Sequence, residues 1–219
     1  MTERLPLFPL GTVLFPGMAL SLRVFEDRYL ALVRDLLDGP GPRRFGVVSI
    51  ELGHEVGPGA ALRLAEVGCV AELRDATLQA DGKYDVAAVG GRRFRMKGTD
   101  SSRPYLRAEV EYLPEEEGAE VDAAAVAAMA AFRRYRRALA AAGAGIADPT
   151  APGDRVRLSY EIAAAAVLDG HDKRRLLAAE DAAQRLRAAR TMIRRETRLL
   201  RAFPTLPGTA FLDGSFHPN

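Results

Sequence analysis

The chain has 219 residues, of which 48% are hydrophobic and 27% charged, so we expect a folded globular protein rather than a disordered one. Lys and Arg number 31 against 29 for Asp and Glu, and this net charge of +2 gives no global argument for a nucleic-acid partner. The single cysteine, Cys69, excludes an intramolecular disulfide and favours a reducing compartment. Residues 1–4 do not resemble a signal peptide, and no apolar run approaches the roughly 20 residues of a membrane helix. We therefore expect a cytoplasmic protein without a membrane partner.

The first half of the chain carries short apolar runs that predict strands. The opening run at 5–10 contains prolines that cannot donate ladder hydrogen bonds, so we expect an edge or irregular strand there. A turn at 15–17 and a strand at 18–24 follow. Apolar residues spaced three and four apart then predict a helix over about 26–37, ended by Gly39 and Pro40.

Further strands are predicted up to residue 112. One lies at 46–50, and one or two more span 61–78 with a break near Gly68. Asp81-Gly82 and Gly90-Gly91 are predicted turns, with short strands after each of them. The alternation of apolar and charged residues at 106–112 is typical of a half-buried strand.

The second half of the chain shows helical periodicity. After a polar linker at 115–118, helices are predicted over about 122–141 and 154–168, the latter capped by Asp154. A short helix follows over 173–179 with Asp172 as its cap, and a last one over 181–201.

These elements predict an α+β fold with separate β and helical parts. Residues 1–116 would form a β-domain with one or two short helices, built on a strongly bent sheet or open barrel. Residues 117–203 would form a helical bundle, and 204–219 an extended or disordered tail.

Three motifs follow one another along this pattern. The first is Leu-Pro-Leu-Phe-Pro-Leu-Gly-Thr-Val-Leu-Phe-Pro-Gly-Met at 5–18. The second is Val-Gly-Cys-Val-Ala-Glu-Leu at 67–73, followed by the turn at Asp81-Gly82 and by Gly-Arg-Arg-Phe-Arg at 91–95. The third is helical and consists of Leu-Leu-Ala-Ala-Glu-Asp at 176–181, then Arg185-Leu186 and Glu196. The ordered series covers residues 4–201 and resembles the N-terminal, substrate-recognition domain of bacterial-type Lon proteases.

The resemblance implies a PUA-like β pseudo-barrel followed by a C-terminal α-helical bundle. It also implies a role in recognising unfolded or degron-bearing protein. The chain ends where the ATPase of that family would begin, so we expect a stand-alone module that lacks the ATPase and the peptidase.

Catalytic and metal-binding patterns do not emerge from the sequence. No Gly-Lys-Ser or Gly-Lys-Thr phosphate loop and no Gly-X-Ser-X-Gly elbow occurs. The histidines His54, His171 and His217 have no ligand partner at helical or hairpin spacing, and Cys69 is better explained as a small buried apolar residue than as a nucleophile paired with His54. We therefore expect no enzyme activity, no catalytic residue, no metal and no cofactor.

The first candidate site is a peptide-binding surface. Phe15 and Met18 would belong to an exposed apolar loop, with Arg92 and Phe94 on a nearby strand. The alternatives are a turn packed onto the barrel and the outer face of a strand. The partner would be unfolded polypeptide or a dedicated protein, within protein quality control, and the chain would be a monomer or a weak dimer.

The second candidate site is the last helix. Ten basic and four acidic residues lie between 172 and 201. One interpretation is an RNA-binding regulator that contacts phosphates through Arg187, Arg190, Arg194 and Arg198. The other is a solvated face whose arginine stems cover apolar surface. The helix lacks aromatic residues that would stack on bases. A small-molecule cleft between the two domains is a third possibility, for which the sequence names no ligand.

Overall fold

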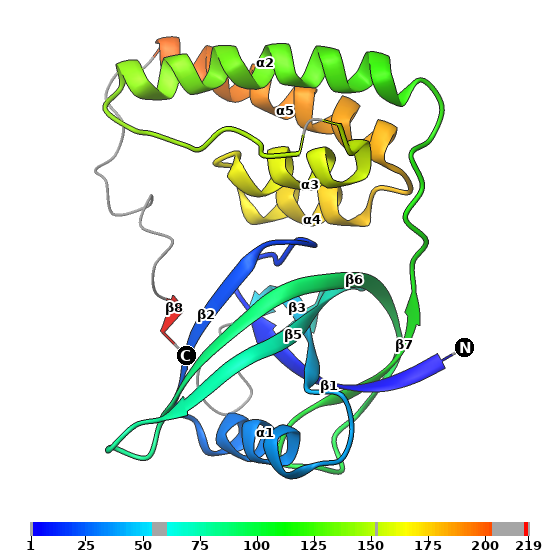
Figure 1. Cartoon of the computed structure of the whole chain (residues 1–219), viewed down its shortest axis with the longest axis vertical. Helices are drawn as coiled ribbons and strands as arrows, with labels where there is room; N and C mark the ends of the chain where they lie inside the picture. The colour runs from blue at the N-terminus through cyan, green and yellow to red at the C-terminus, as the bar shows by residue number, and fades with distance from the viewer. Residues whose placement is uncertain (1, 54–60, 152, 203–216, 219) are drawn as a thin grey trace. The chain divides into compact units, whose positions relative to one another are not determined.

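The computed structural model describes residues 2–53, 61–151, 153–202 and 217–218 (Figure 1). The described residues up to Pro114, together with 217–218, form one compact unit, and those from Glu115 to 202 form a second. The predicted division after residue 116 lies two residues further along. Because the first unit is a sheet and the second is helical, the chain is an α+β protein.

The first unit is a mixed sheet that curls into a ring. Strand β1 pairs with β3 and β7, β7 pairs with β6, β6 pairs with β5, and β5 returns to β3. Strand β4 extends the sheet beside β3, and β2 extends it beside β6. The strands are β1 Thr2–Leu10, β2 Ala19–Val24, β3 Arg44–Gly53, β4 Ala61–Leu64, β5 Val67–Leu78, β6 Tyr84–Asp100, β7 Arg107–Tyr112 and β8 His217–Pro218.

The opening strand corrects the first sequence prediction, because β1 lies inside the sheet and not at its edge. Residues Thr2–Pro6 pair with β7, and Leu7–Leu10 pair with β3. Each half of β1 therefore has its registered partner on one side only. This explains how a strand with two prolines, which lack an N–H, is accommodated between two neighbours.

Two glycines that were predicted to interrupt strands lie inside them. A Cβ on Gly68 would lie 2.5 Å from the Phe94 ring and from the Val47 carbonyl oxygen, so glycine allows β5 to pack there. The break falls instead between β4 and β5. Gly90 lies within the continuous strand β6, where a Cβ would lie 2.1 Å from the carbonyl oxygen of Phe15. Close packing, and not a turn, accounts for both glycines. The turn predicted at Asp81-Gly82 is confirmed, with Gly82 at φ +79°.

Helix α1 (Asp27–Asp38) covers one face of the sheet and closes the larger core cluster of this unit. It buries Tyr29, Leu30, Leu32, Val33 and Leu36, the face that the three-and-four spacing predicted. The ring of Tyr29 stacks on Phe8 of β1 at 4.1 Å between centroids.

The second unit consists of helices packed around α5 (Ala182–Ala202). Helix α2 (Val121–Ala141) lies alongside α5, and α3 (Arg155–Ala165) and α4 (Gly170–Ala178) pack beside it (Figure 1). The Asp154 side chain accepts a hydrogen bond from the Arg157 N–H, which confirms the predicted cap. The cap predicted at Asp172 is wrong, because Asp169 caps α4 by accepting from the Asp172 N–H. Asp172 lies within the helix, where it is buried and paired with Arg195.

Candidate functional site

The outer edge of β2 is a place where an extended chain can join the sheet. The Gly90 N–H donates to the Met18 carbonyl at 2.8 Å, and Leu20 and Leu22 follow in register with Ala88 and Val86 of β6. Because hydrogen-bonding direction alternates along a strand, the backbone groups of Ala19 and Ser21 point away from β6. The sheet thus presents main-chain donors and acceptors along this edge.

Strand β8 uses part of this edge. It pairs with β2 in parallel, Leu22 opposite His217 and Arg23 opposite Pro218 (Figure 1). The registered pairing covers two residues, and Ala19 and Ser21 lie beyond it. The structure therefore contains an extended backbone bound in the manner of strand addition.

A shallow hollow of about 260 Å³ extends from β2 across β6 to β5, away from the outer edge of β2. Small side chains, Ser21 and Ala87, form part of its lining, and the carboxylates of Asp75 and Asp85 lie beside them. The Asp75 carboxylate accepts a hydrogen bond from the Thr77 hydroxyl at 3.0 Å. The Asp85 Oδ1 is buried with no hydrogen-bond partner among the described residues. A side chain of a strand added to β2 would lie beside the small side chain of Ser21, with the two carboxylates further in, on β6 and β5.

The loop that was predicted to expose Phe15 and Met18 is packed as a turn. The Met18 N–H donates to the Phe15 carbonyl at 3.0 Å, and the Gly17 N–H donates to the Gly90 carbonyl at 2.8 Å. The Phe15 side chain is 0% exposed, so the expectation of an exposed Phe15 is wrong. Met18 is half-buried against the core. Of this pair, Met18 alone reaches the surface, beside the beginning of the β2 edge.

The second predicted pair also divides into one buried and one exposed residue. Phe94 is 0% exposed within the smaller core cluster, so it does not contact a surface ligand in this conformation. The exposed Arg92 has its guanidinium carbon 4.3 Å from the ring centroid of Tyr112. The alternation that buries every second residue of β6 from Tyr84 to Gly90, continued along the strand, indicates a buried Phe94. Arg92 and Arg93 depart from this alternation, because Arg92 is exposed and Arg93 is buried.

The four arginines predicted on the last helix differ in their surroundings. Arg187 donates to the Ala119 carbonyl at 2.7 Å and lies 3.6 Å from a Glu120 carboxylate oxygen. Arg190, Arg194 and Arg198 are exposed and line a hollow together with Arg134 of α2. Arg134 is not among the predicted site residues, although the four arginines between 133 and 137 could have indicated it.

The described part of the chain holds neither a cluster of metal ligands nor a membrane-spanning helix. No cluster of three or more His, Cys, Asp or Glu able to hold a metal occurs there. No helix there has the length and apolarity to cross a membrane. Cys69 is buried in β5, as predicted for a small apolar residue.

Comparison with known proteins identifies the class of this module. Residues 4–195 match the family model described as the ATP-dependent protease La (LON) substrate-binding domain. The chain belongs to this family, and the resemblance deduced from its motifs is confirmed.

The chain is similar to one part of several longer proteins. It is 29% identical to Lon protease 2 of Sorangium cellulosum over 209 residues, which cover 91% of this chain and 25% of that protein. It is 32% identical to Lon protease 2 of Myxococcus xanthus over 117 residues, 53% of this chain and 14% of that one. The chain thus spans about a quarter or less of the length of these relatives.

Two solved structures share the fold. A Lon N-terminal domain protein from Xanthomonas campestris aligns with a TM-score of 0.59 and 24% identity, over 92% of this chain and 98% of its own. The N-terminal domain of a Mycobacterium avium complex Lon protease aligns with a TM-score of 0.66 and 19% identity, over 88% and 98%. The chain therefore has the fold of Lon N-terminal domains.

Proposed function

We propose that this chain is a non-catalytic module that binds polypeptide in an extended conformation along the outer edge of β2. Membership of a substrate-binding family supports a binding role. The observation that carries the proposal is the parallel pairing of β8 with Leu22 and Arg23, which is an example of extended backbone on this edge.

Strand addition suits a partner that is unfolded. Main-chain hydrogen bonds give affinity without requiring a particular sequence, and alternate side chains of the added strand would lie beside Ser21, at the rim of the hollow. A folded protein has already paired its own backbone groups, so it competes poorly for the edge. Met18 at the start of β2 would add apolar contact, and Arg92 a more distant polar one. An affinity in the micromolar range, on the order of −8 kcal/mol, is expected.

Binding of unfolded chains also suggests a cellular role for this module. A module that prefers unfolded chains would serve protein quality control, and we place it in the cytoplasm, acting as a monomer or a weak dimer. The closed ring of strands supports the expected PUA-like type of barrel. RNA binding is the alternative function, based on the basic last helix. The family match, to a substrate-binding domain of a protease, does not support it.

The test is fluorescence anisotropy with a labelled, permanently unfolded polypeptide that carries no acidic side chain. Ser21→Pro removes a backbone N–H that points away from β6, while Ser21→Ala retains this N–H and serves as the matched control. We expect Ser21→Pro to weaken binding about tenfold or more, and Ser21→Ala to bind as the wild type does. High salt should change the affinity little, because backbone hydrogen bonds carry it.

Two outcomes would count against the proposal. No saturable binding by the wild-type chain would reject polypeptide binding itself. Equal affinities of the two Ser21 variants, with circular dichroism showing both folded, would reject the β2 edge. Met18→Ser, which leaves the edge intact, should weaken binding by a smaller factor than Ser21→Pro does.

A further inference from the structure

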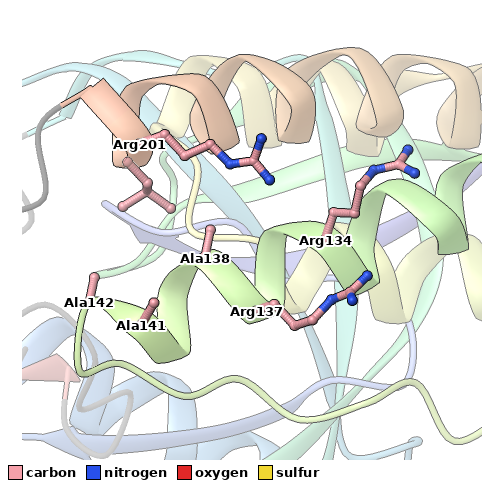
Figure 2. Close-up of a pocket in the computed structure, with 7 residues that line it drawn as sticks. Arg134, Arg137, Ala138, Ala141, Ala142 and Arg201 are labelled. Carbon is pink, nitrogen blue, oxygen red and sulfur yellow. The ribbon is translucent and has the colours of Figure 1, made fainter.

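A second feature of the chain lies in the helical unit, where the C-terminal halves of α2 and α5 face each other across two adjoining hollows. Their volumes are about 540 and 490 Å³, and both are lined by Arg134 and Arg201. Figure 2 shows Arg134 and Arg137 projecting from α2 and Arg201 from α5, around the small side chains of Ala138, Ala141 and Ala142. We call the two hollows together the arginine groove.

Six arginines of the described residues line the arginine groove, and no described Asp or Glu is part of its lining. Among the described residues none of the six is paired with a carboxylate, whereas neighbours on the same helices are: Arg136 pairs with Asp148, and Arg195 with Asp172. The six are Arg134, Arg137, Arg190, Arg194, Arg198 and Arg201. Arginines without carboxylate partners are thus gathered at one place in this unit.

Helix dipoles offset only part of this charge. Both helices end near the arginine groove, and each C-terminus contributes about half a negative charge. Six guanidinium groups exceed that sum several-fold. The groove therefore keeps a positive potential that attracts anions, and this attraction weakens as salt rises.

The lining favours carboxylates set among apolar side chains. The planar fork of arginine binds carboxylate or phosphate in a bidentate manner. Ala138, Ala141 and Leu200 supply apolar surface within the first hollow. Among the described residues, no aromatic side chain lines either hollow, so single-stranded nucleic acid would find none of the stacking partners there that it commonly uses. From Arg190 to Arg201 the helix rises about 16 Å, the span of about five residues of extended chain.

We propose that the arginine groove binds an acidic, apolar-containing segment of a polypeptide. This inference rests on the proposed function, because it takes the ligand to be polypeptide. It adds a second site, in the helical unit, that selects polypeptide by its charge. The β2 edge would bind backbone with little regard to sequence, and the arginine groove would favour chains that carry acidic segments.

The test is fluorescence anisotropy with a labelled peptide of repeated Glu-Glu-Leu-Ala. The control peptide has Gln in place of Glu, and an oligothymidylate of matched charge tests for nucleic acid. Arg134→Glu reverses a charge that lines both hollows, while Arg133→Glu makes the same change on the adjacent exposed residue outside them. We expect Arg134→Glu and the Gln peptide each to weaken binding about tenfold or more, and Arg133→Glu to weaken it by less than about twofold.

Each remaining outcome overturns the inference. Equal losses from Arg133→Glu and Arg134→Glu would mean attraction by overall charge and not by a groove. Preference for oligothymidylate over the acidic peptide would mean a nucleic-acid site. Ser21→Pro separates this inference from the proposed function. It should bind the Glu-Glu-Leu-Ala peptide normally, and Arg134→Glu should still bind the unfolded polypeptide without acidic side chains.

Discussion

The guanidinium carbon of Arg185 lies 3.9 Å from the ring centroid of Tyr160, at the centre of the helical unit. Arg185 is 0% exposed, and it donates to the Leu176 carbonyl at 3.0 Å and to the Ser159 hydroxyl at 2.8 Å. The Tyr160 hydroxyl in turn donates to the Glu115 carboxylate at 2.5 Å. One buried side chain thus ties α5 to α3 and to the end of α4.

Arg185→Ala should therefore destabilise the helical unit by about 3 kcal/mol or more. The substitution leaves buried acceptors without a donor and opens a cavity beside Tyr160. Urea unfolding followed by circular dichroism measures the loss. Arg190→Ala, a substitution at an exposed position five residues further along α5, should stay within about 0.5 kcal/mol of wild type. Equal stabilities of the two variants would show that the buried contacts of Arg185 do not stabilise the helical unit.

Gly90→Ala should destabilise the β-unit by about 1–3 kcal/mol, because the new Cβ would lie 2.1 Å from the Phe15 carbonyl oxygen. The turn at 15–17 would have to move away from β6, with loss of the hydrogen bond from Gly17 to Gly90. Gly98→Ala is the matched control on the same strand, since no atom lies within 4 Å of its Cβ position. Urea midpoints of the two variants check the prediction, and a control that loses as much stability would contradict it.

The elements that sequence predicted well are those set by local periodicity and caps. The apolar spacing gave the buried face of α1, and Asp154 caps α3 as predicted. These features depend on residues within one or two helical turns of each other, so they can be predicted from the local sequence.

The errors concern contacts between residues far apart in the chain. Gly90 was predicted to turn the chain because glycine often does so, yet its small size serves the approach of Phe15, 75 residues earlier. The burial of Phe15 and Phe94, and the meeting of Arg134 with Arg198 in one hollow, likewise depend on tertiary packing. Propensity and spacing do not carry such information.

The stability of the chain should fall as pH rises from about 10 to about 12. Burial raises the pKa of Tyr135 to about 12, and burial together with a hydrogen bond to Asp35 raises that of Tyr105 to about 12. Burial and a hydrogen bond to Glu3 do the same for Tyr112. A tyrosine in the unfolded chain loses its proton near pH 10, so between these values the folded state holds more protons and the unfolded state gains in relative stability.

Unfolding by urea at a series of alkaline pH values checks this dependence. Tyr135→Phe should remove the contribution of the helical unit to this loss of stability at alkaline pH. Tyr112→Phe should remove part of the contribution of the β-unit. Stability that stays constant up to pH 12 would contradict the raised tyrosine pKa values.

Asp169 and Asp172 should differ in which substitutions they tolerate. Asp169 caps α4 through the Asp172 N–H at 2.8 Å, so Asp169→Ala should cost about 1 kcal/mol and Asp169→Ser, which still caps, much less. Asp172 is buried and accepts from Arg195 at 2.8 Å, a contact that a shorter serine does not reproduce. Asp172→Ser should therefore cost about as much as Asp172→Ala, in contrast to position 169. Thermal unfolding of the four variants measures these differences. If serine preserved stability at position 172 but not at position 169, Asp172 and not Asp169 would be the cap of α4.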